Sequence, residues 1–357
     1  MRVLCFIVFF CFTSLVSAQH AENVIIVTLD GLRWQEMFGG AQEMLLDAKA
    51  GGVKDVPGLR KAYWRPTAEA RREALMPFVW SVIAKEGQIF GDPERSATAL
   101  STNGLKFSYP GYSEMFTGVV DPTIDSNGKK DNPNLSVLEY LDGLPAFRGK
   151  VAAVCTWDVF PSIFRTSKNK LRVISGWELP AVAERTTRHR ELEVFMNNLP
   201  RYWPDNVYDI MTMELAKEEL KQHHPRVLYV GLGETDEWAH GRRYDLYLNA
   251  AHYGDRFLRE LWQEAQKMPQ YQGKTAMLVI CDHGRGTNKV DWTDHGKDTP
   301  GAEYIWMAAM GPGVSPLGVR EKVNFKQVQF AATIARVLGE DFQKGNPKAA
   351  GAMGLTK

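Results

Sequence analysis

The sequence predicts an α/β fold: a single large three-layer domain whose mostly parallel central sheet carries helices on both faces. Helix-like segments separate several apolar runs of strand length, and this alternation is typical of parallel sheets. The runs are rich in residues that buried parallel strands use, and they occupy residues 23–30, 150–158, 225–233 and 274–281. With 44% hydrophobic and 24% charged residues among 357, the composition is that of an ordinary globular protein.

The first 18 residues differ from the rest of the chain. One positive charge, Arg2, precedes a short apolar run, and the segment ends in Val16-Ser17-Ala18. This pattern predicts a secretory signal peptide at residues 1–18, cleaved after Ala18. The apolar run is shorter than the ~20 residues that a spanning helix needs, so the mature protein is expected to have no membrane span. We therefore expect a secreted or periplasmic protein whose single domain covers residues 19–357.

Net charge and cysteine content exclude two further classes of protein. The formal net charge of +1 indicates no polyanion-binding surface, so no nucleic-acid polymer is expected as a partner. Beyond the signal peptide only Cys155 and Cys281 remain, each inside an apolar run, and two such residues make no disulfide framework. The oligomeric state is left open.

The remaining elements follow in order along the chain. Residues 67–85 have an amphipathic helical pattern that Pro77 should kink or break. A further strand is expected at 304–310, and stretches around 47–102 and 161–202 are expected to be insertions on the sheet. Further helices are expected at 136–144, 187–202, 205–223, 244–266 and 325–338.

Carboxylates and imidazoles stand where two of the predicted strands end. Asp30 closes the first strand, and Asp282-His283-Gly284 follows the last of the four long runs. The carboxyl ends of parallel strands open into the crevice where α/β sheets bind ligands. A hard oxygen ligand beside a borderline nitrogen ligand suits a divalent metal ion, although a solvated turn would have the same sequence.

A second group has spacing suited to chelation. Asp236 and His240 are four residues apart, so on a helical turn both side chains face one point. An ion pair on a helix surface is the alternative interpretation. His295 adds a third ligand twelve residues after His283.

Ser108 is expected at or just before the start of a helix. Pro110 suits the first turn and Gly118 the end. The free N–H groups of a helix N-terminus favour a phosphate or an alkoxide, so Ser108 is a candidate nucleophile, with a simple N-cap as the alternative. Two divalent ions beside a serine hydroxyl suit phosphoryl transfer.

In this order and spacing the motifs resemble the alkaline phosphatase superfamily, and most closely its branch of type I phosphodiesterases, nucleotide pyrophosphatases and related phosphatases. The motifs that carry the resemblance are Asp30, Ser108-Tyr109-Pro110-Gly111-Tyr112 with Thr117-Gly118, Asp236 with His240, Asp282-His283-Gly284, and His295. The resemblance implies two ions, usually zinc, with Mn or Mg as alternatives. It groups Asp30, Ser108, Asp282 and His283 around one ion and Asp236, His240 and His295 around the other.

Two departures leave the substrate open. The diesterases typically have Thr at the nucleophile position and Asn-His after the Pro, where this chain has Ser108 and Gly111-Tyr112. Their phosphoryl-binding Asn has its nearest candidate in Asn127, with Asn132 and Asn134 behind it. The substrate is expected to be a small phosphate ester, monoester or diester. Candidate substrate contacts are Asn127, Tyr112, Trp157 and Arg285.

Three other classes of protein share part of this pattern. A sulfatase needs an Arg where Tyr112 stands. A cofactor-independent phosphoglycerate mutase shares the metal ligands but would not need an export signal. A secreted metal- or phosphate-binding protein would not need Ser108.

Overall fold

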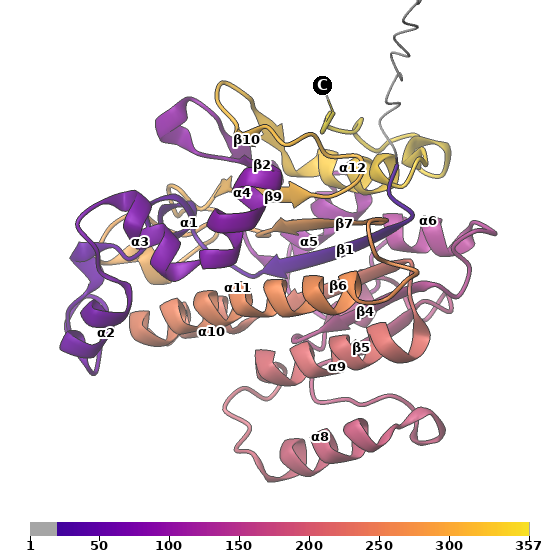
Figure 1. Ribbon diagram of the computed structural model, residues 1–357, viewed down its shortest axis with the longest axis horizontal. Coiled ribbons are helices and arrows are strands. Elements are labelled where there is room, and N and C mark those ends of the chain that lie inside the picture. The colour runs from indigo at the N-terminus through magenta and orange to yellow at the C-terminus, as the bar shows by residue number, and fades with distance from the viewer. Residues whose placement is uncertain (1–19, 357) are drawn as a thin grey trace, which may run out of the picture.

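The computed structural model describes residues 20–356, so the predicted signal peptide lies outside the described residues. Its centre is an eight-stranded sheet in the order β10-β2-β9-β7-β1-β6-β4-β5 (Figure 1). All neighbouring pairs are parallel except those that β9 makes with β2 and β7. The strands are β1 (Asn23–Leu29), β2 (Gly87–Phe90), β4 (Val151–Cys155), β5 (Arg172–Ser175), β6 (Val227–Leu232), β7 (Thr275–Ile280), β9 (Met307–Met310) and β10 (Gly318–Val319).

Helices cover both faces of this sheet. In Figure 1, α9 and α11 lie in front of it and α5 lies behind, where α5 packs against α6 and α12. The predicted mostly parallel three-layer α/β fold is thus confirmed. The helices are α1 (Trp34–Gly39), α2 (Val56–Tyr63), α3 (Ala68–Leu75), α4 (Ala84–Glu86), α5 (Ser108–Thr117), α6 (Val137–Gly143), α7 (Phe160–Ile163), α8 (Thr187–Asn198), α9 (Asp209–His223), α10 (Glu234–His240), α11 (Tyr244–Gln266) and α12 (Phe330–Val337).

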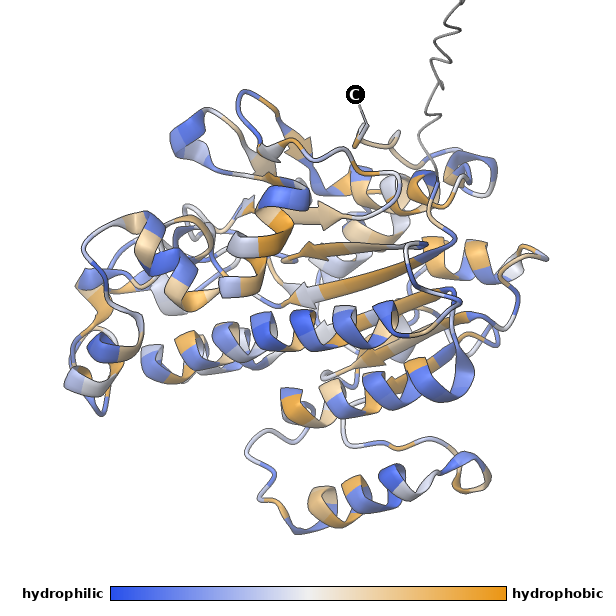
Figure 2. Cartoon of the chain, viewed as in Figure 1, coloured by the Kyte–Doolittle hydropathy of each residue, from blue (hydrophilic) through white to orange (hydrophobic). Residues whose placement is uncertain are grey.

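The four long apolar runs form the centre of the sheet. Every residue of β1, β4, β6 and β7 is buried, because helices cover both faces and leave no solvent-facing side for polar residues. Figure 2 shows the strands as mainly hydrophobic and the outer face of α11 as hydrophilic. These strands run in the same direction, so their carboxyl ends share one edge of the sheet.

Two expected elements differ in the structure, and the break expected at Pro77 is confirmed. The strand expected at 304–310 is two strands: β8 (Tyr304–Ile305) pairs with β3 (Ala99–Leu100) in a small second sheet, and β9 joins the main sheet antiparallel to its neighbours. The helix expected at 325–338 starts only at Phe330, since β11 (Phe325–Lys326) pairs with β3. The helix expected at 67–85 breaks before Pro77, as the proline predicts, and continues as a five-residue π-helix at Val79–Ile83.

Both stretches expected to be insertions supply a strand to the main sheet. β2 lies in 47–102 and β5 in 161–202. Most of the remainder of each stretch is helix and loop, and Figure 1 shows α8 below the rest of the fold. Among residues 20–356 no helix combines the length and apolar character needed to cross a bilayer.

Candidate metal and nucleophile site

One group of ligands forms where β1 and β7 end side by side. Nε2 of His283 lies 3.3 Å from Oδ1 of Asp30 and 3.4 Å from Oδ2 of Asp282. One ligand atom from each residue lies within 4.8 Å of the others, and all three residues are buried. Because β1 and β7 pair in parallel register, the residues that follow them reach the same point.

The chemistry of this group fits a divalent cation. Oδ1 of Asp30 and Oδ2 of Asp282 are buried oxygens without a hydrogen-bond partner in the described chain, and such groups are costly unless something neutralises them. Burial and the neighbouring Asp30 raise the pKa of Asp282 well above its usual range. Burial lowers the pKa of His283, but Asp282 and Asp30 outweigh it and raise that pKa to about 9. A bound cation would relieve this repulsion.

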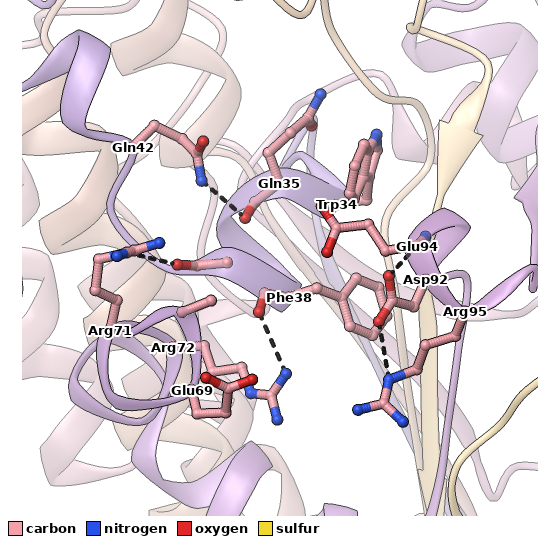
Figure 3. A pocket seen from close by; sticks show the side chains of 12 residues that line it. Trp34, Gln35, Phe38, Gln42, Glu69, Arg71, Arg72, Asp92, Glu94 and Arg95 are labelled. Atoms are coloured by element: carbon pink, nitrogen blue, oxygen red, sulfur yellow. Dashed lines mark hydrogen bonds and ion pairs between the residues drawn. The ribbon is translucent and has the colours of Figure 1, made fainter. Parts of the chain in front are cut away.

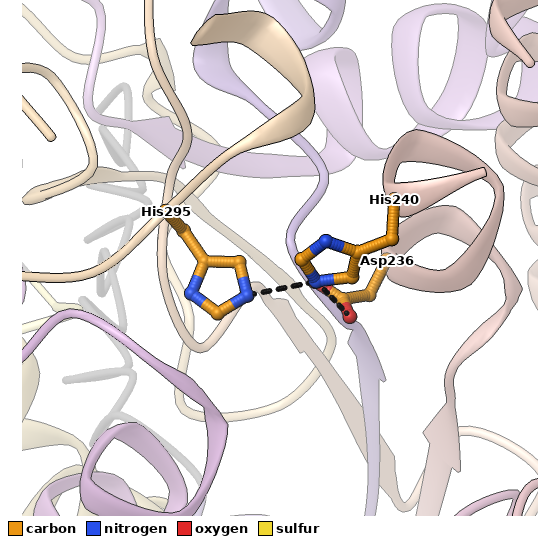
Figure 4. Close-up of side chains that lie close together, drawn as sticks. All are labelled: Asp236, His240 and His295. Atoms are coloured by element: carbon orange, nitrogen blue, oxygen red, sulfur yellow. Dashed lines mark hydrogen bonds and ion pairs between the residues drawn. The ribbon is translucent and has the colours of Figure 1, made fainter. Parts of the chain in front are cut away.

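The second group forms at α10. Asp236 and His240 are one turn apart, with Nε2 of His240 3.1 Å from Oδ2 of Asp236. Nε2 of His295 lies 3.0 Å from Nε2 of His240, and a dashed line marks this contact in Figure 4. Burial, and then the neighbouring His283, lower the pKa of His295, which keeps its imidazole in the neutral form that binds metals. These three residues form the second candidate metal site among the described residues.

The two groups adjoin each other. Oδ1 of Asp236 lies 3.7 Å from Nε2 of His283 and 3.7 Å from Nε2 of His295. The rings of His283 and His295 have centroids 4.1 Å apart. The structure thus gathers all six predicted ligands at one place, in the two sets that the resemblance implies.

Ser108 lies beside the first of these ligand groups. It is the first residue of α5, which ends at Thr117 and is followed by Gly118 in the left-handed region. Its Oγ lies 3.4 Å from Nε2 of His283. The helix start reaches this point because Gly111 has no side chain: a Cβ there would lie 2.8 Å from the carbonyl oxygen of Asp282.

The loop before α5 contacts both α5 itself and the predicted ligand His295. Glu114 of α5 is buried and accepts hydrogen bonds from the backbone N–H groups of Thr102 and Asn103. Further along this loop, the carbonyl of Lys106 lies 3.2 Å from Nδ1 of His295. This contact leaves Nε2 of His295 to face the ligand group. No motif in the sequence marked Glu114 or Lys106.

A cleft of about 390 Å³ opens beside these groups. Two predicted substrate contacts, Asn127 and Trp157, line it together with Ser108. Oδ1 of Asn127 accepts a hydrogen bond of 3.0 Å from the N–H of Tyr109 in the first turn of α5. The remaining wall includes three predicted ligands and several unpredicted residues, namely Asp30, Asp236, His240, Lys129, Asp205, Asn206 and Glu237.

The other two predicted contacts are not in the cleft. Arg285 is fully buried and donates to the Asp236 carboxylate and to three backbone carbonyls. Tyr112 is buried too, and its hydroxyl donates to Oδ2 of Asp30 over 2.9 Å. Both side chains donate to carboxylates of predicted metal ligands and are buried, so the prediction that they face the substrate is corrected.

Sequence reasoning also missed the residue that anchors α10. Asp209, at the start of α9, is buried and accepts hydrogen bonds from the N–H groups of Gly233 (2.8 Å) and Glu234. It thereby satisfies donors at the start of the short helix that carries Asp236 and His240. Burial and the neighbouring Glu234 raise the pKa of Asp209 to about 8.

A cavity of about 380 Å³ lies elsewhere, between α1, α3 and the turn at residues 93–95 (Figure 3). Its charged lining consists of three arginines and three acids, of which Arg95 and Asp92 pair with each other. None of the predicted ligands or Ser108 lines it. It therefore has no part in the candidate site.

Fold and geometry together define an α/β protein with two adjoining carboxylate–imidazole groups and a serine hydroxyl at the carboxyl edge of its sheet. No family model matches the sequence, and no curated protein does. Solved structures do match the fold. The alkaline phosphatase PafA superposes with a TM-score of 0.62 at 10% identity, covering 94% of this chain and 98% of that one.

Two further structures show the same fold. A TAB5 alkaline phosphatase mutant with Mg bound in its M3 site gives a TM-score of 0.52 at 11% identity, covering 91% of this chain and all of that one. The 2-O GAG sulfatase BT1596 superposes with a TM-score of 0.53 at 11% identity, covering 94% of this chain and 73% of that one. The chain has the alkaline phosphatase superfamily fold, as its motifs predict.

Proposed function

We propose that this protein is a metal-dependent hydrolase of phosphoric esters that uses Ser108 as its nucleophile. The observation that carries the proposal is the position of Ser108 Oγ, at the N-terminus of α5 and 3.4 Å from Nε2 of His283. Two groups of three ligands adjoin at this point. Such an arrangement can activate a hydroxyl group and stabilise charge on a phosphoryl group.

Asp30, Asp282 and His283 would hold one divalent ion, and Asp236, His240 and His295 the other, most simply Zn²⁺ given the mixed O and N ligands. Bound there, the ions would supply Lewis-acid activation of the hydroxyl and neutralise phosphoryl charge.

The chain's own residues then act as follows. Ser108 Oγ loses its proton to solvent and forms a bond to phosphorus while the bond to the leaving oxygen breaks, and that oxygen takes a proton from water. A water molecule next attacks phosphorus and breaks its bond to Oγ, which takes a proton and becomes the Ser108 hydroxyl again. The product is phosphate from a monoester substrate and a phosphate monoester from a diester. Asn127 accepts from Tyr109 through its oxygen, so its amide N–H₂ group is left to donate to a phosphoryl oxygen.

The cleft suits a small substrate. Its volume of about 390 Å³ is within the range of small-molecule sites. Trp157 supplies an aromatic wall for the leaving group, and Lys129 supplies a cation held at 2.6 Å by Asp158. The chain's net charge of +1 agrees with a small ester rather than a nucleic-acid polymer.

The test is a set of paired rates on p-nitrophenyl phosphate and bis-p-nitrophenyl phosphate, before and after chelation and after adding back Zn²⁺, Mn²⁺ or Mg²⁺. Turnover that chelation removes and one ion restores supports the proposal, and the faster ester assigns the protein to monoesters or diesters. Metal binding without turnover of either ester would contradict it.

A sulfatase is the second candidate, because the 2-O GAG sulfatase BT1596 shares the fold. Tyr112 stands where a sulfatase needs an arginine, and its hydroxyl is engaged by Asp30. We therefore expect no turnover of p-nitrophenyl sulfate under the same conditions.

We also propose that the protein is exported. The support is the N-terminal pattern of Arg2, the apolar run and Val16-Ser17-Ala18. N-terminal sequencing of the protein from the extracellular or periplasmic fraction should start at Gln19. A mature protein that retains Met1 would contradict export by cleavage.

A further inference from the structure

Arg285 is a cation enclosed in protein directly beneath the candidate metal site. Its side chain has no exposed surface. Burial lowers its pKa to about 9, against the attraction of Asp30. A buried charge is retained only where it is paired and hydrogen-bonded, so its contacts indicate what it does.

Each nitrogen of the guanidinium group contacts a different segment. Nε donates to the carbonyl of Gly31 over 3.2 Å, and Nη1 donates to the carbonyl of Thr293 over 2.5 Å. Nη2 donates to Oδ1 of Asp236 and, over 3.1 Å, to the carbonyl of the same residue.

These segments are the ones that carry the predicted ligands. Gly31 follows Asp30, Thr293 lies two residues before His295, and Arg285 itself lies two residues after His283. Only a planar fork with five donors reaches three directions at once, which a lysine ammonium on a flexible stem does not reproduce.

The contact with Asp236 also divides the roles of its two oxygens. Oδ1 accepts from the guanidinium group and also lies 3.7 Å from Nε2 of His295. Oδ2 lies 3.1 Å from Nε2 of His240. The bond from Arg285 occupies Oδ1, which leaves Oδ2 as the oxygen available to an ion in the second ligand group.

We propose that Arg285 is a positioning residue for the second metal ion: it fixes Asp236 as a one-oxygen ligand and holds His295 in reach. This inference rests on the proposed two-ion site. It replaces the role of substrate contact that the sequence suggested.

The test uses Arg285→Lys, which keeps the charge but loses the fork, with Arg285→Gln as a second variant. Zinc per chain is measured by mass spectrometry after dialysis, and the two zinc dissociation constants by competition with a chromophoric chelator. We expect roughly 10- to 100-fold weaker binding of one ion, as for other residues that orient metal ligands, with the other ion retained. Excess zinc should restore kcat in Arg285→Lys.

Arg33→Lys is the matched control, because Arg33 is equally buried and bonds to Glu36 and the Gly286 carbonyl without contacting a predicted ligand. It should leave both zinc affinities unchanged. Unchanged affinities in Arg285→Lys with a raised KM would overturn the proposal in favour of a substrate contact. Equally weaker binding of both ions in Arg285→Lys would overturn the proposal in favour of a general packing role. Weaker zinc binding in Arg33→Lys as well would overturn it in the same way.

The zinc measurements need no turnover, so they separate this proposal from the hydrolase proposal. If neither variant folds, Co²⁺ absorption of wild-type protein gives the decisive result. A second Co²⁺ bound with one Asp236 oxygen and two imidazoles should have the strong visible bands of low coordination. Weak bands typical of six-coordination at both ions would contradict a one-oxygen Asp236.

Discussion

The Nε2 atoms of His240 and His295 lie 3.0 Å apart, although 55 residues separate them in the chain. Two neutral imidazoles can share only one proton at such a contact, and both rings flank the Asp236 carboxylate. A cation between them would satisfy all three groups. The pair is therefore the most direct geometric sign of a metal ion at α10.

Replacing ligands should remove the ions separately. His295→Ala is expected to lose about one zinc per chain and keep the other, whereas Asp282→Ala should lose the ion near β7. Elemental analysis after dialysis gives the stoichiometry. His252→Ala, a partly buried histidine on α11 outside both groups, should keep the full content. Unchanged zinc in both ligand variants would refute the two groups as metal sites.

Ser108→Ala should lower the turnover rate by at least about 10³-fold, since loss of a nucleophile leaves only residual catalysis. Its zinc content should stay near that of wild type, because Asp30, Asp282 and His283 do not depend on the hydroxyl. Rates on p-nitrophenyl phosphate and zinc per chain are the measurements. Retained activity with lost zinc would mean that Ser108 is a ligand only.

Asn127→Ala should lower kcat/KM by roughly 10-fold or more through loss of an amide that binds a phosphoryl oxygen. The alanine variant also removes the oxygen that accepts a 3.0 Å hydrogen bond from the N–H of Tyr109. Asn127→Asp therefore serves as a second variant, because it keeps this acceptor and loses only the amide donor. Asn198→Ala, on α8 and away from the cleft, is the control. An unchanged kcat/KM in both Asn127 variants would exclude a role in substrate binding.

Gly111→Ala should impair both stability and activity. The new Cβ would lie 2.8 Å from the Asp282 carbonyl oxygen, so α5 must shift away from β7 and take Ser108 with it. We expect a cost of about 1–3 kcal/mol in unfolding free energy. Gly143→Ala, where a Cβ meets no atom within 4 Å, should be neutral or slightly stabilising. Urea unfolding of both variants compares them.

Asp255 should give the protein a pH-dependent stability that has nothing to do with metal. Burial raises its pKa to about 7, although it accepts 2.8 Å hydrogen bonds from the N–H groups of Phe78 and Val79. The folded state thus binds this proton more tightly than the unfolded chain. Its contribution is fully present below the unfolded pKa of ~3.9 and is lost as pH rises through about 7.

Asp255→Asn mimics the protonated side chain and should remove this dependence. The difference in unfolding free energy between wild type and variant should therefore change by roughly 1.4 kcal/mol per unit of pKa shift between pH 4 and pH 8. Urea unfolding in chelator-treated protein measures it. A constant difference across this range would show that Asp255 is charged in the fold at all these pH values.

Much of the fold and of the ligand set could be predicted from the sequence for one physical reason. Apolar runs buried on both faces carry no polar residues, so the position where each run stops marks the edge of the sheet. Asp30 and Asp282 stand at such positions in β1 and β7. The spacing of Asp236 and His240 is likewise a local property, since one helical turn brings both to the same face.

Local patterns were less informative where pairing partners are distant in sequence. Residues 304–310 look like one strand, but their two halves pair with different sheets. The apolar residues at 325–338 look helical throughout, but Phe325 pairs with Ala99. The partner of a strand is decided by which other strand lies beside it in the fold. The residue pattern of a single segment does not contain that information.

By itself, then, the sequence determined the fold class, the place of Ser108 at a helix start and the six candidate ligands. Only the tertiary structure decided the roles of the groups around them. Arg285 follows the Asp-His-Gly motif directly and looked like a substrate contact, but its partners Gly31 and Asp236 lie 254 and 49 residues away. Whether a polar side chain faces the substrate or supports a ligand depends on which distant segments enclose it, and only the packed structure fixes that.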